Sequence, residues 1–254
     1  MVYGHKDKKD FFIDLIERDQ LGHAYIFYGD PEIGKFLFSL CLANYVEDNE
    51  FKKTEKQFID SIIINPEEDE SIGIEELREF KKILNKKPLK SNKRFAVINN
   101  SEKMTPQAQG SMLKIVEESP HHTTFIFISS NPRTLLKPLY SRLFKVYFER
   151  MKKEEIESIL EKDFSIKKEK AKKISNESFG RIGRAINYLQ KENKNKKEES
   201  IENYIEDKIL NLYYKNKIKN SHKLKLLLNK ESEIKRFNLN PKLQEKVIRE
   251  IIKK

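Results

Sequence analysis

The octapeptide Gly29-Asp30-Pro31-Glu32-Ile33-Gly34-Lys35-Phe36 decides the fold. It has the spacing G-x-x-x-x-G-K, follows the apolar run Ala24–Tyr28 and leads into a helical pattern over Lys35–Glu47. A glycine-rich loop between a strand and a helix surrounds phosphate with backbone N–H groups, and the helix N-terminus adds partial positive charge. The octapeptide therefore predicts a P-loop in which Lys35 reaches the phosphates. A plain glycine turn between strand and helix is the alternative interpretation.

Three positions around this loop lack the side chains that ATP hydrolysis requires. The residue after the P-loop lysine normally carries a hydroxyl that binds Mg²⁺, and here it is Phe36. The expected acidic strand end follows Arg94–Ile98, but it reads Asn99-Asn100. Neither amide carries the negative charge that a hard cation favours or can act as a general base. We therefore predict a site without catalysis and without a metal, which requires no cofactor and leaves only weak ATP or ADP binding open.

Short apolar runs alternate with helical patterns over residues 1–150. Apolar runs of this length suit a parallel sheet that is covered by helices on both faces. The sequence therefore predicts an α/β domain. The expected strands are Ala24–Tyr28, Ser61–Ile64, Phe95–Ile98 and Thr124–Ser129, and the expected helices are Lys9–Glu17, Lys35–Glu47, Ile74–Leu84 and Pro106–Glu118.

The rest of the chain has helical patterns only. Residues 151–190 predict a three-helix lid, with helices at Lys152–Glu161, Lys167–Asn176 and Ile182–Gln190. Residues 191–200 contain no apolar side chain and are predicted to be a linker. Apolar spacing returns over residues 201–254, which predicts a small C-terminal helical domain.

Composition bounds the functional classes. Lys and Arg total 51 against 40 Asp and Glu, and the net charge of +11 favours either contact with nucleic acid or an acidic partner, or a solvated lysine-rich surface. The single cysteine, Cys41, excludes an internal disulfide and a cysteine zinc cluster. No run approaches the ~18 apolar residues of a membrane span, and residues 1–10 are charged without a signal-peptide core. We expect a cytoplasmic protein with no membrane contact.

Further motifs follow one another over residues 1–190. They are His23-Ala24-Tyr25-Ile26-Phe27, Met104-Thr105-Pro106-Gln107-Ala108, Leu113-Lys114-Ile115-Val116-Glu117-Glu118-Ser119-Pro120, Asn131-Pro132 and Ser141-Arg142. In their order and spacing these motifs, together with the loop at Gly29, resemble the clamp-loader subunits of the AAA+ family. The resemblance implies an AAA+ P-loop domain over residues 1–150, a lid over 151–190, a linker over 191–200 and a collar-like helical domain over 201–254.

The motor subunits of that family carry a complete P-loop, an acidic strand end and usually a four-cysteine zinc module, which this sequence lacks. It therefore most resembles the delta-prime type of bacterial DNA polymerase III. The resemblance implies a non-catalytic subunit of a hetero-oligomer with motor (gamma/tau-like) and delta-like subunits, which contains primer-template DNA and loads sliding clamps during replication. An active motor ATPase and a stand-alone DNA-binding protein on a retired P-loop fold are the alternatives.

The resemblance also assigns individual residues. Arg142 matches an arginine finger that acts in trans on a neighbouring subunit; the alternative is a surface arginine at the start of a strand. Gly29, Gly34 and Lys35 match a vestigial nucleotide site, to which Arg184 would contribute as the sensor 2 arginine of the lid. Residues 129–131 match the sensor 1 region. The alternatives are an exposed helix arginine and a polar strand end.

Overall fold

A five-stranded parallel sheet forms the centre of the first part of the chain. The computed structural model describes residues 2–67, 70–84, 86–118, 120–193, 201–216, 218–236 and 241–253. Within them the strand order is β2-β3-β4-β1-β5, and every pair is parallel. The strands are β1 (Ala24–Tyr28), β2 (Ile62–Ile64), β3 (Arg94–Ile98), β4 (Thr123–Ser129) and β5 (Phe144–Tyr147).

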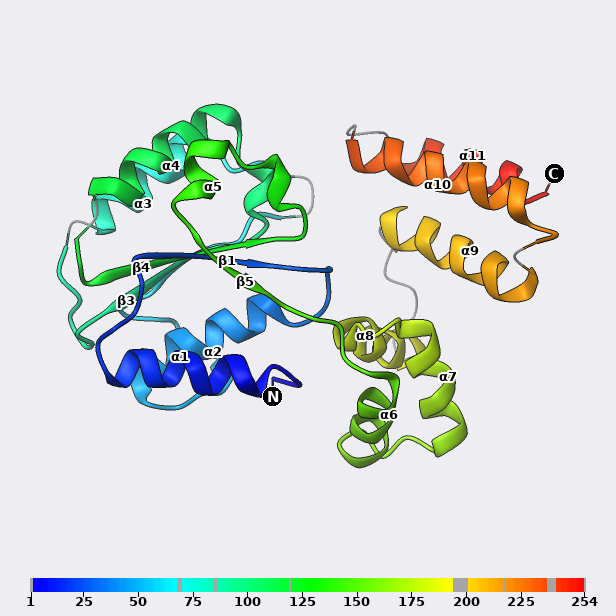
Figure 1. Ribbon diagram of the computed structural model, residues 1–254, viewed down its shortest axis with the longest axis horizontal. Coiled ribbons are helices and arrows are strands. Elements are labelled where there is room, and N and C mark those ends of the chain that lie inside the picture. Colours follow the sequence, from blue (N-terminus) through cyan, green and yellow to red (C-terminus); the bar gives the residue numbers. More distant parts are fainter. Residues whose placement is uncertain are drawn as a thin grey trace. The chain divides into compact units, whose positions relative to one another are not determined.

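Helices cover both faces of this sheet (Figure 1). Figure 1 shows α3 (Ile74–Leu84), α4 (Pro106–Glu118) and α5 (Lys137–Ser141) on one face, and α1 (Lys6–Glu17) and α2 (Lys35–Asp48) on the other. Thr105 helps to start α4, because its side-chain oxygen accepts a hydrogen bond from the Ala108 N–H at 3.2 Å. The predicted α/β class with a parallel sheet is confirmed.

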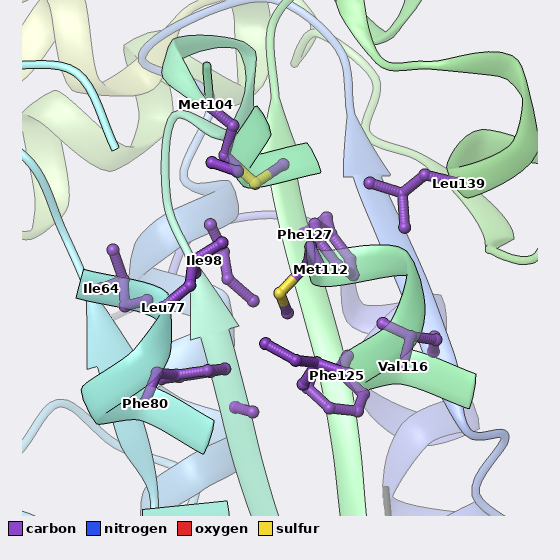
Figure 2. Close-up of a cluster of buried hydrophobic side chains, with 14 of the residues drawn as sticks. Ile64, Leu77, Phe80, Ile98, Met104, Met112, Val116, Phe125, Phe127 and Leu139 are labelled. Carbon is purple, nitrogen blue, oxygen red and sulfur yellow. The ribbon is translucent and has the colours of Figure 1, made fainter. Parts of the chain in front are cut away.

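Alternate residues of each strand enter separate cores on the two faces. Ile26, Ile98 and Phe127 belong to the core under α3, α4 and α5, which Figure 2 shows in close-up. Their neighbours Phe27 and Val97 belong to the core under α1 and α2. Because the central strands are buried on both faces, they read as continuous apolar runs in the sequence.

The fifth strand and the short helix before it are not among the predicted elements. The four predicted strands and four predicted helices are present, with bounds that differ by at most three residues. β5 escaped prediction because it lies at the edge of the sheet and most of its side chains are exposed, so Phe-Lys-Val-Tyr gives no apolar run. α5 has only five residues, which is too short for a helical period.

The lid consists of α6 (Lys153–Lys162), α7 (Lys168–Ser178) and α8 (Ile182–Asn193). α8 ends at Asn193, three residues beyond the expected helix end at Gln190 and within the segment predicted to be a linker. Lys191, Glu192 and Asn193 need no apolar contact to extend a helix, because backbone hydrogen bonds suffice once the preceding turns are formed. Residues 194–200, the remainder of the predicted linker, lie outside the described residues.

Contacts divide the chain into two compact units, residues 1–186 and 187–254. The second unit contains α9 (Ile201–Asn216), α10 (Ser221–Arg236) and α11 (Pro241–Lys253), which bury Ile205, Leu227, Ile234 and Ile248. The finer domain boundaries at 150 and 190 stay predictions. Among the described helices, none combines the length and the apolar character that crossing a membrane requires.

We predict that residues 1–193 fold without the remainder of the chain. Both cores of the sheet end at Phe148, so removing residues 194–254 takes no side chain from them. Circular dichroism melting should give a cooperative transition, and gel filtration should give a monodisperse peak. A chain that ends at Leu143 is the control and should not fold, because it loses β5 and the buried Phe148. A noncooperative melt of residues 1–193 would contradict the prediction.

Candidate functional site

The predicted P-loop joins β1 to α2 and depends on two glycines. Gly29 has φ +141°, and a Cβ on it would lie 2.4 Å from the Phe148 carbonyl oxygen. Gly34 has φ +97°, in the left-handed region, and is the N-cap of α2. Both positions therefore require glycine for conformational reasons. At Gly29 the close approach of the chain beyond β5 adds a second reason.

The Lys35 side chain folds back onto the loop. Its ammonium donates hydrogen bonds to the carbonyl oxygens of Gly29, at 2.8 Å, and Asp30, at 2.5 Å. Only 6% of the residue is exposed, and this burial lowers the pKa of Lys35 from 10.5 to about 8, although the carboxylates of Glu102 and Asp30 partly oppose the shift. The lysine is thus a buried cation that donates hydrogen bonds to two carbonyl oxygens of its own loop.

Two contacts join the loop to the segment that leads into the lid and to the lid itself. The Arg150 guanidinium donates to both carboxylate oxygens of Asp30, at 2.6 and 3.0 Å, and this pairing holds the pKa of Asp30 below its ordinary value. The Gly183 N–H donates to the Glu32 carbonyl oxygen at 2.8 Å. A Cβ on Gly183 would lie 2.7 Å from that oxygen. The first turn of α8 can therefore approach the loop this closely only because residue 183 is glycine.

Arg150 was missed in the sequence analysis, although a signal was present. A carboxylate in a loop suited to binding phosphate repels the phosphate unless a cation neutralises it. The presence of Asp30 in the loop therefore indicated that a basic residue would pair with it. The sequence alone did not show that residue 150 would be that partner.

A cavity of about 350 Å³ lies beside the loop. Its size is within the range of small-molecule sites. Its lining comes from the P-loop and α2, the loop after β3, the end of β4, the start of α8 and the N-terminal segment. The residues are Val2, Tyr3, Pro31, Glu32, Gly34, Lys35, Phe36, Leu37, Asn99, Asn100, Ile128, Ser130, Ile182, Gly183 and Ile186.

Phe36, Asn99 and Asn100, the residues at the positions where the sequence analysis looks for a hydroxyl and an acidic pair, all line this cavity. Phe36 is half-buried and packs against the core under α1 and α2. The Asn99 side chain donates to Asn65 Oδ1 at 2.7 Å, and Asn100 has φ +49°, which asparagine tolerates well. The structure therefore brings Phe36, Asn99 and Asn100 together with Lys35, as the sequence predicts for a P-loop site.

A carboxylate that sequence reasoning missed also reaches this region. Glu102 Oε1 accepts hydrogen bonds from the Ser130 N–H at 3.1 Å and from the Ser130 hydroxyl at 2.5 Å. Its negative charge also acts on Lys35. Glu102 follows the end of β3 by four residues, beyond the two positions where an acidic pair is expected, so the motif spacing did not point to it.

The lid arginine lies elsewhere. Arg184 is buried, and its guanidinium carbon lies 6.0 Å from the centre of the Phe179 ring. Ile182 and Gly183 line the cavity, but their neighbour Arg184 is not among the described residues that do so. Arg184 is therefore not the exposed helix arginine of the alternative interpretation. Its contact with a nucleotide stays a prediction.

Arg142 lies where the parallel strands begin, whereas the cavity lies where they end. It is the C-cap of α5 and precedes β5 by two residues. β5 is parallel to β1, and Phe144 pairs with Tyr25. Extending that register places Arg142 level with His23, six residues before Gly29, which corresponds to about 20 Å along a strand. An arginine side chain cannot span that distance, so Arg142 does not serve the cavity of its own chain.

Comparison with known proteins places the chain in a family. A family model described as DNA polymerase III, delta subunit, matches residues 4–152. The chain belongs to this family. The match covers the sheet and the helices on both of its faces, and it includes Arg142 and the part of the cavity lining that comes from residues 31–130.

Individual relatives are subunits of DNA polymerase III by name. The chain is 29% identical over 163 residues to DNA polymerase III subunit delta' of Bacillus subtilis, covering 59% of this chain and 49% of the relative. It is 30% identical over 156 residues to subunit gamma/tau of Mycoplasma pneumoniae, covering 56% of this chain and 23% of the relative. The matched region thus spans half or less of the length of these relatives.

Solved structures show the same fold. A DNA polymerase III gamma subunit-related protein from Thermotoga maritima aligns with a TM-score of 0.57 at 20% identity, over 93% of this chain and 96% of that one. The RuvB Holliday junction branch migration motor of the same organism aligns with a TM-score of 0.53 at 16% identity, over 74% of this chain and 61% of that one. The fold of this delta-family chain is therefore the AAA+ P-loop fold.

The buried Lys35 predicts a pH dependence of stability. Because its pKa falls from 10.5 in the unfolded chain to about 8 in the fold, the unfolded state binds more protons between these values, and stability rises with pH. Relative to a Lys35→Met variant, the wild-type free energy of unfolding should increase by about 1 kcal/mol between pH 7 and pH 9. Urea denaturation at both pH values measures this difference.

The exposed Lys53 provides the control. Lys53→Met should show no pH-dependent difference from the wild type. A Lys35→Met difference that stays constant from pH 7 to pH 9 would show that Lys35 titrates normally.

Proposed function

We propose that this chain is a clamp-loader subunit that does not hydrolyse ATP itself and completes the ATP site of a neighbouring subunit with Arg142. One observation carries the proposal: Arg142 lies where the strands of the parallel sheet begin, and the chain's own P-loop lies where they end. An arginine that cannot reach its own site, in a family of assembled subunits, is suited to act in trans.

The cavity supports the first half of the proposal. Hydrolysis in P-loop proteins needs a metal held by a hydroxyl and a carboxylate, and a group that orients the attacking water. Phe36, Asn99 and Asn100 supply none of these. Lys35 already donates to two loop carbonyls, so phosphate has to compete with them. We therefore propose that any nucleotide binds here weakly and without a metal, with the Gly34 loop and Lys35 toward phosphate.

The surroundings of Arg142 support the second half. Large apolar side chains close to it in sequence are exposed, namely Leu136 (42%), Phe144 (61%) and Tyr147 (47%). Exposed aromatic residues beside an arginine are the composition of an interface centre. The partners we propose are motor (gamma/tau-like) and delta-like subunits, which together with this chain form a hetero-oligomer on primer-template DNA.

Two other functions remain candidates. The similarity to gamma/tau proteins favours an active motor subunit, which hydrolysis by the isolated chain would establish. The net charge of +11 favours a stand-alone DNA-binding protein, which tight DNA binding without partner subunits would establish.

The isolated chain should not hydrolyse ATP, because it has Phe36 in place of the hydroxyl after the P-loop lysine and Asn99-Asn100 in place of the acidic pair after β3. Phosphate release from Mg-ATP should not exceed that of a Lys35→Ala variant purified in the same way. Lys35→Ala is the control for contaminating ATPases, since it removes the lysine that any P-loop turnover requires. Turnover near ~1 s⁻¹ that disappears in this variant would favour a motor subunit.

Arg142→Ala should lower the ATPase rate of the assembled complex. An arginine finger contributes ~10³–10⁵ in rate at its own site, but other interfaces keep their arginines, so we expect a bulk reduction of about two- to ten-fold. Arg142→Lys should rescue poorly, because an ammonium cannot reproduce the planar guanidinium. The measurement is DNA- and clamp-stimulated phosphate release by the complex reconstituted with its partner subunits.

Arg133→Ala is the matched control, since Arg133 is an exposed arginine nine residues earlier in the same connection. It should leave the rate unchanged. Wild-type turnover from a fully assembled Arg142→Ala complex would show that Arg142 is a surface residue without a catalytic role.

A further inference from the structure

Two elements of the fold hold the Arg142 side chain. Its Nη2 lies 2.7 Å from Oε1 of Glu117, in the last turn of α4. Its Nη1 donates to the Pro138 carbonyl oxygen of α5 at 2.8 Å. Both side chains of the ion pair remain about half exposed, so the guanidinium is oriented by the protein and is accessible from outside.

The backbone on the arginine side of this pair is fixed by burial. Leu139 and Leu143 flank Arg142, and both belong to the core under α3, α4 and α5. The Arg142 N–H donates to the Leu139 carbonyl oxygen at 3.1 Å, which closes the short helix. The remaining freedom of Arg142 is therefore in its side-chain torsions, and the contacts at Glu117 and Pro138 restrict these.

The glutamate side is also fixed. Ile115 and Val116 of the same turn are buried in that core. The carbonyl of Val116 would normally accept from the N–H of residue 120, but Pro120 has none. The ring nitrogen Nε2 of His23 lies within hydrogen-bond distance of this carbonyl and takes the place of the missing donor. The end of α4, and with it Glu117, is thereby tied to the start of β1.

We propose that Glu117 is a positioning residue for Arg142, an inference that rests on the proposed role of Arg142 in trans. A guanidinium has five N–H donors, and the contacts with Glu117 and Pro138 use one on each terminal nitrogen. The donors that remain present a planar group of fixed direction to an anion outside the chain. The anion that such a group recognises is the terminal phosphate of a nucleotide bound by the adjoining subunit.

The next residue provides a matched comparison. Glu118 follows Glu117 in the same exposed turn, but it pairs with Lys81 of α3 at 2.9 Å and makes no ion pair with Arg142. The two glutamates have the same charge, each is exposed, and each makes one ion pair with a different partner. Their effects therefore separate a specific action through Arg142 from a general change in surface charge.

The experiment compares Glu117→Ala, Glu117→Gln and Glu118→Ala in the complex reconstituted with its partner subunits, DNA and sliding clamp. We expect Glu117→Ala to lower kcat for ATP by less than Arg142→Ala does, with the about two- to five-fold effect that an exposed ion pair can supply at one site as the upper bound. Glu117→Gln should retain most of the rate, because its amide oxygen accepts the same hydrogen bond. Glu118→Ala should match the wild type. Thermal melting and gel filtration check folding and assembly.

The double variant decides whether Glu117 acts through Arg142. In an Arg142→Ala background, Glu117→Ala should cause no further loss. An equal loss in both backgrounds would overturn the inference. So would a Glu117→Ala rate at or above that of the wild type, since Glu117 would then be idle or would sequester the arginine. If Arg142→Ala is slow while Glu117→Ala is normal, only this inference fails; if Arg142→Ala is itself normal, the proposed function fails with it.

Discussion

The parallel pairing of β1 with β4 is the constraint on which the site depends. The register runs from Ala24 opposite Phe125 to Tyr28 opposite Ser129, and both strands are buried along almost their whole length. Because parallel strands end at the same edge, the P-loop after Tyr28 must lie beside the polar residues that follow Ser129. β3 pairs with β4 on its other side and delivers Asn99 to the same edge. A slip of one residue would invert both cores, so the apolar sequence of three strands fixes the composition of the cavity.

Interactions within the protein stabilise the conformation of the P-loop. Gly29 is required by the Phe148 carbonyl, and the ammonium of Lys35 is held by the carbonyls of its own loop. Asp30 is paired with Arg150, and Glu32 accepts the hydrogen bond from the lid. Each feature that makes the octapeptide look like a nucleotide-binding motif therefore has a structural reason. The spacing G-x-x-x-x-G-K predicts the fold securely, but it is weak support for catalysis when the hydroxyl and the acidic pair are missing.

The sequence allowed prediction of what local pattern determines. Buried strands and amphipathic helices have characteristic periods, and the positions of Phe36, Asn99 and Asn100 follow from motif spacing once the strands are placed. β5 was missed because its exposed edge gives no apolar run. Arg150, Glu102 and Glu117 were missed for another reason: each partner is distant in sequence, and only the packed fold brings a charge to it. Arg150 contacts Asp30, which is 120 residues away in the sequence, and hydrophobic periodicity does not predict such a contact.

A series of contacts links the start of β1 to Arg142 and gives several of the family-like motifs a structural role. Pro120 cannot donate to the end of α4, so His23 does, and this contact ties the last turn of α4 to β1. That turn carries Glu117, which contacts Arg142 at the end of α5. His23, Glu117 and Arg142 all lie toward the end of the sheet where the parallel strands begin, whereas the cavity lies where the strands end. The residues at these two ends of the sheet can therefore be substituted independently. Substitutions among the cavity residues at one end of the strands therefore leave the support of Arg142 at the other end intact, as the proposed action on a neighbouring subunit requires.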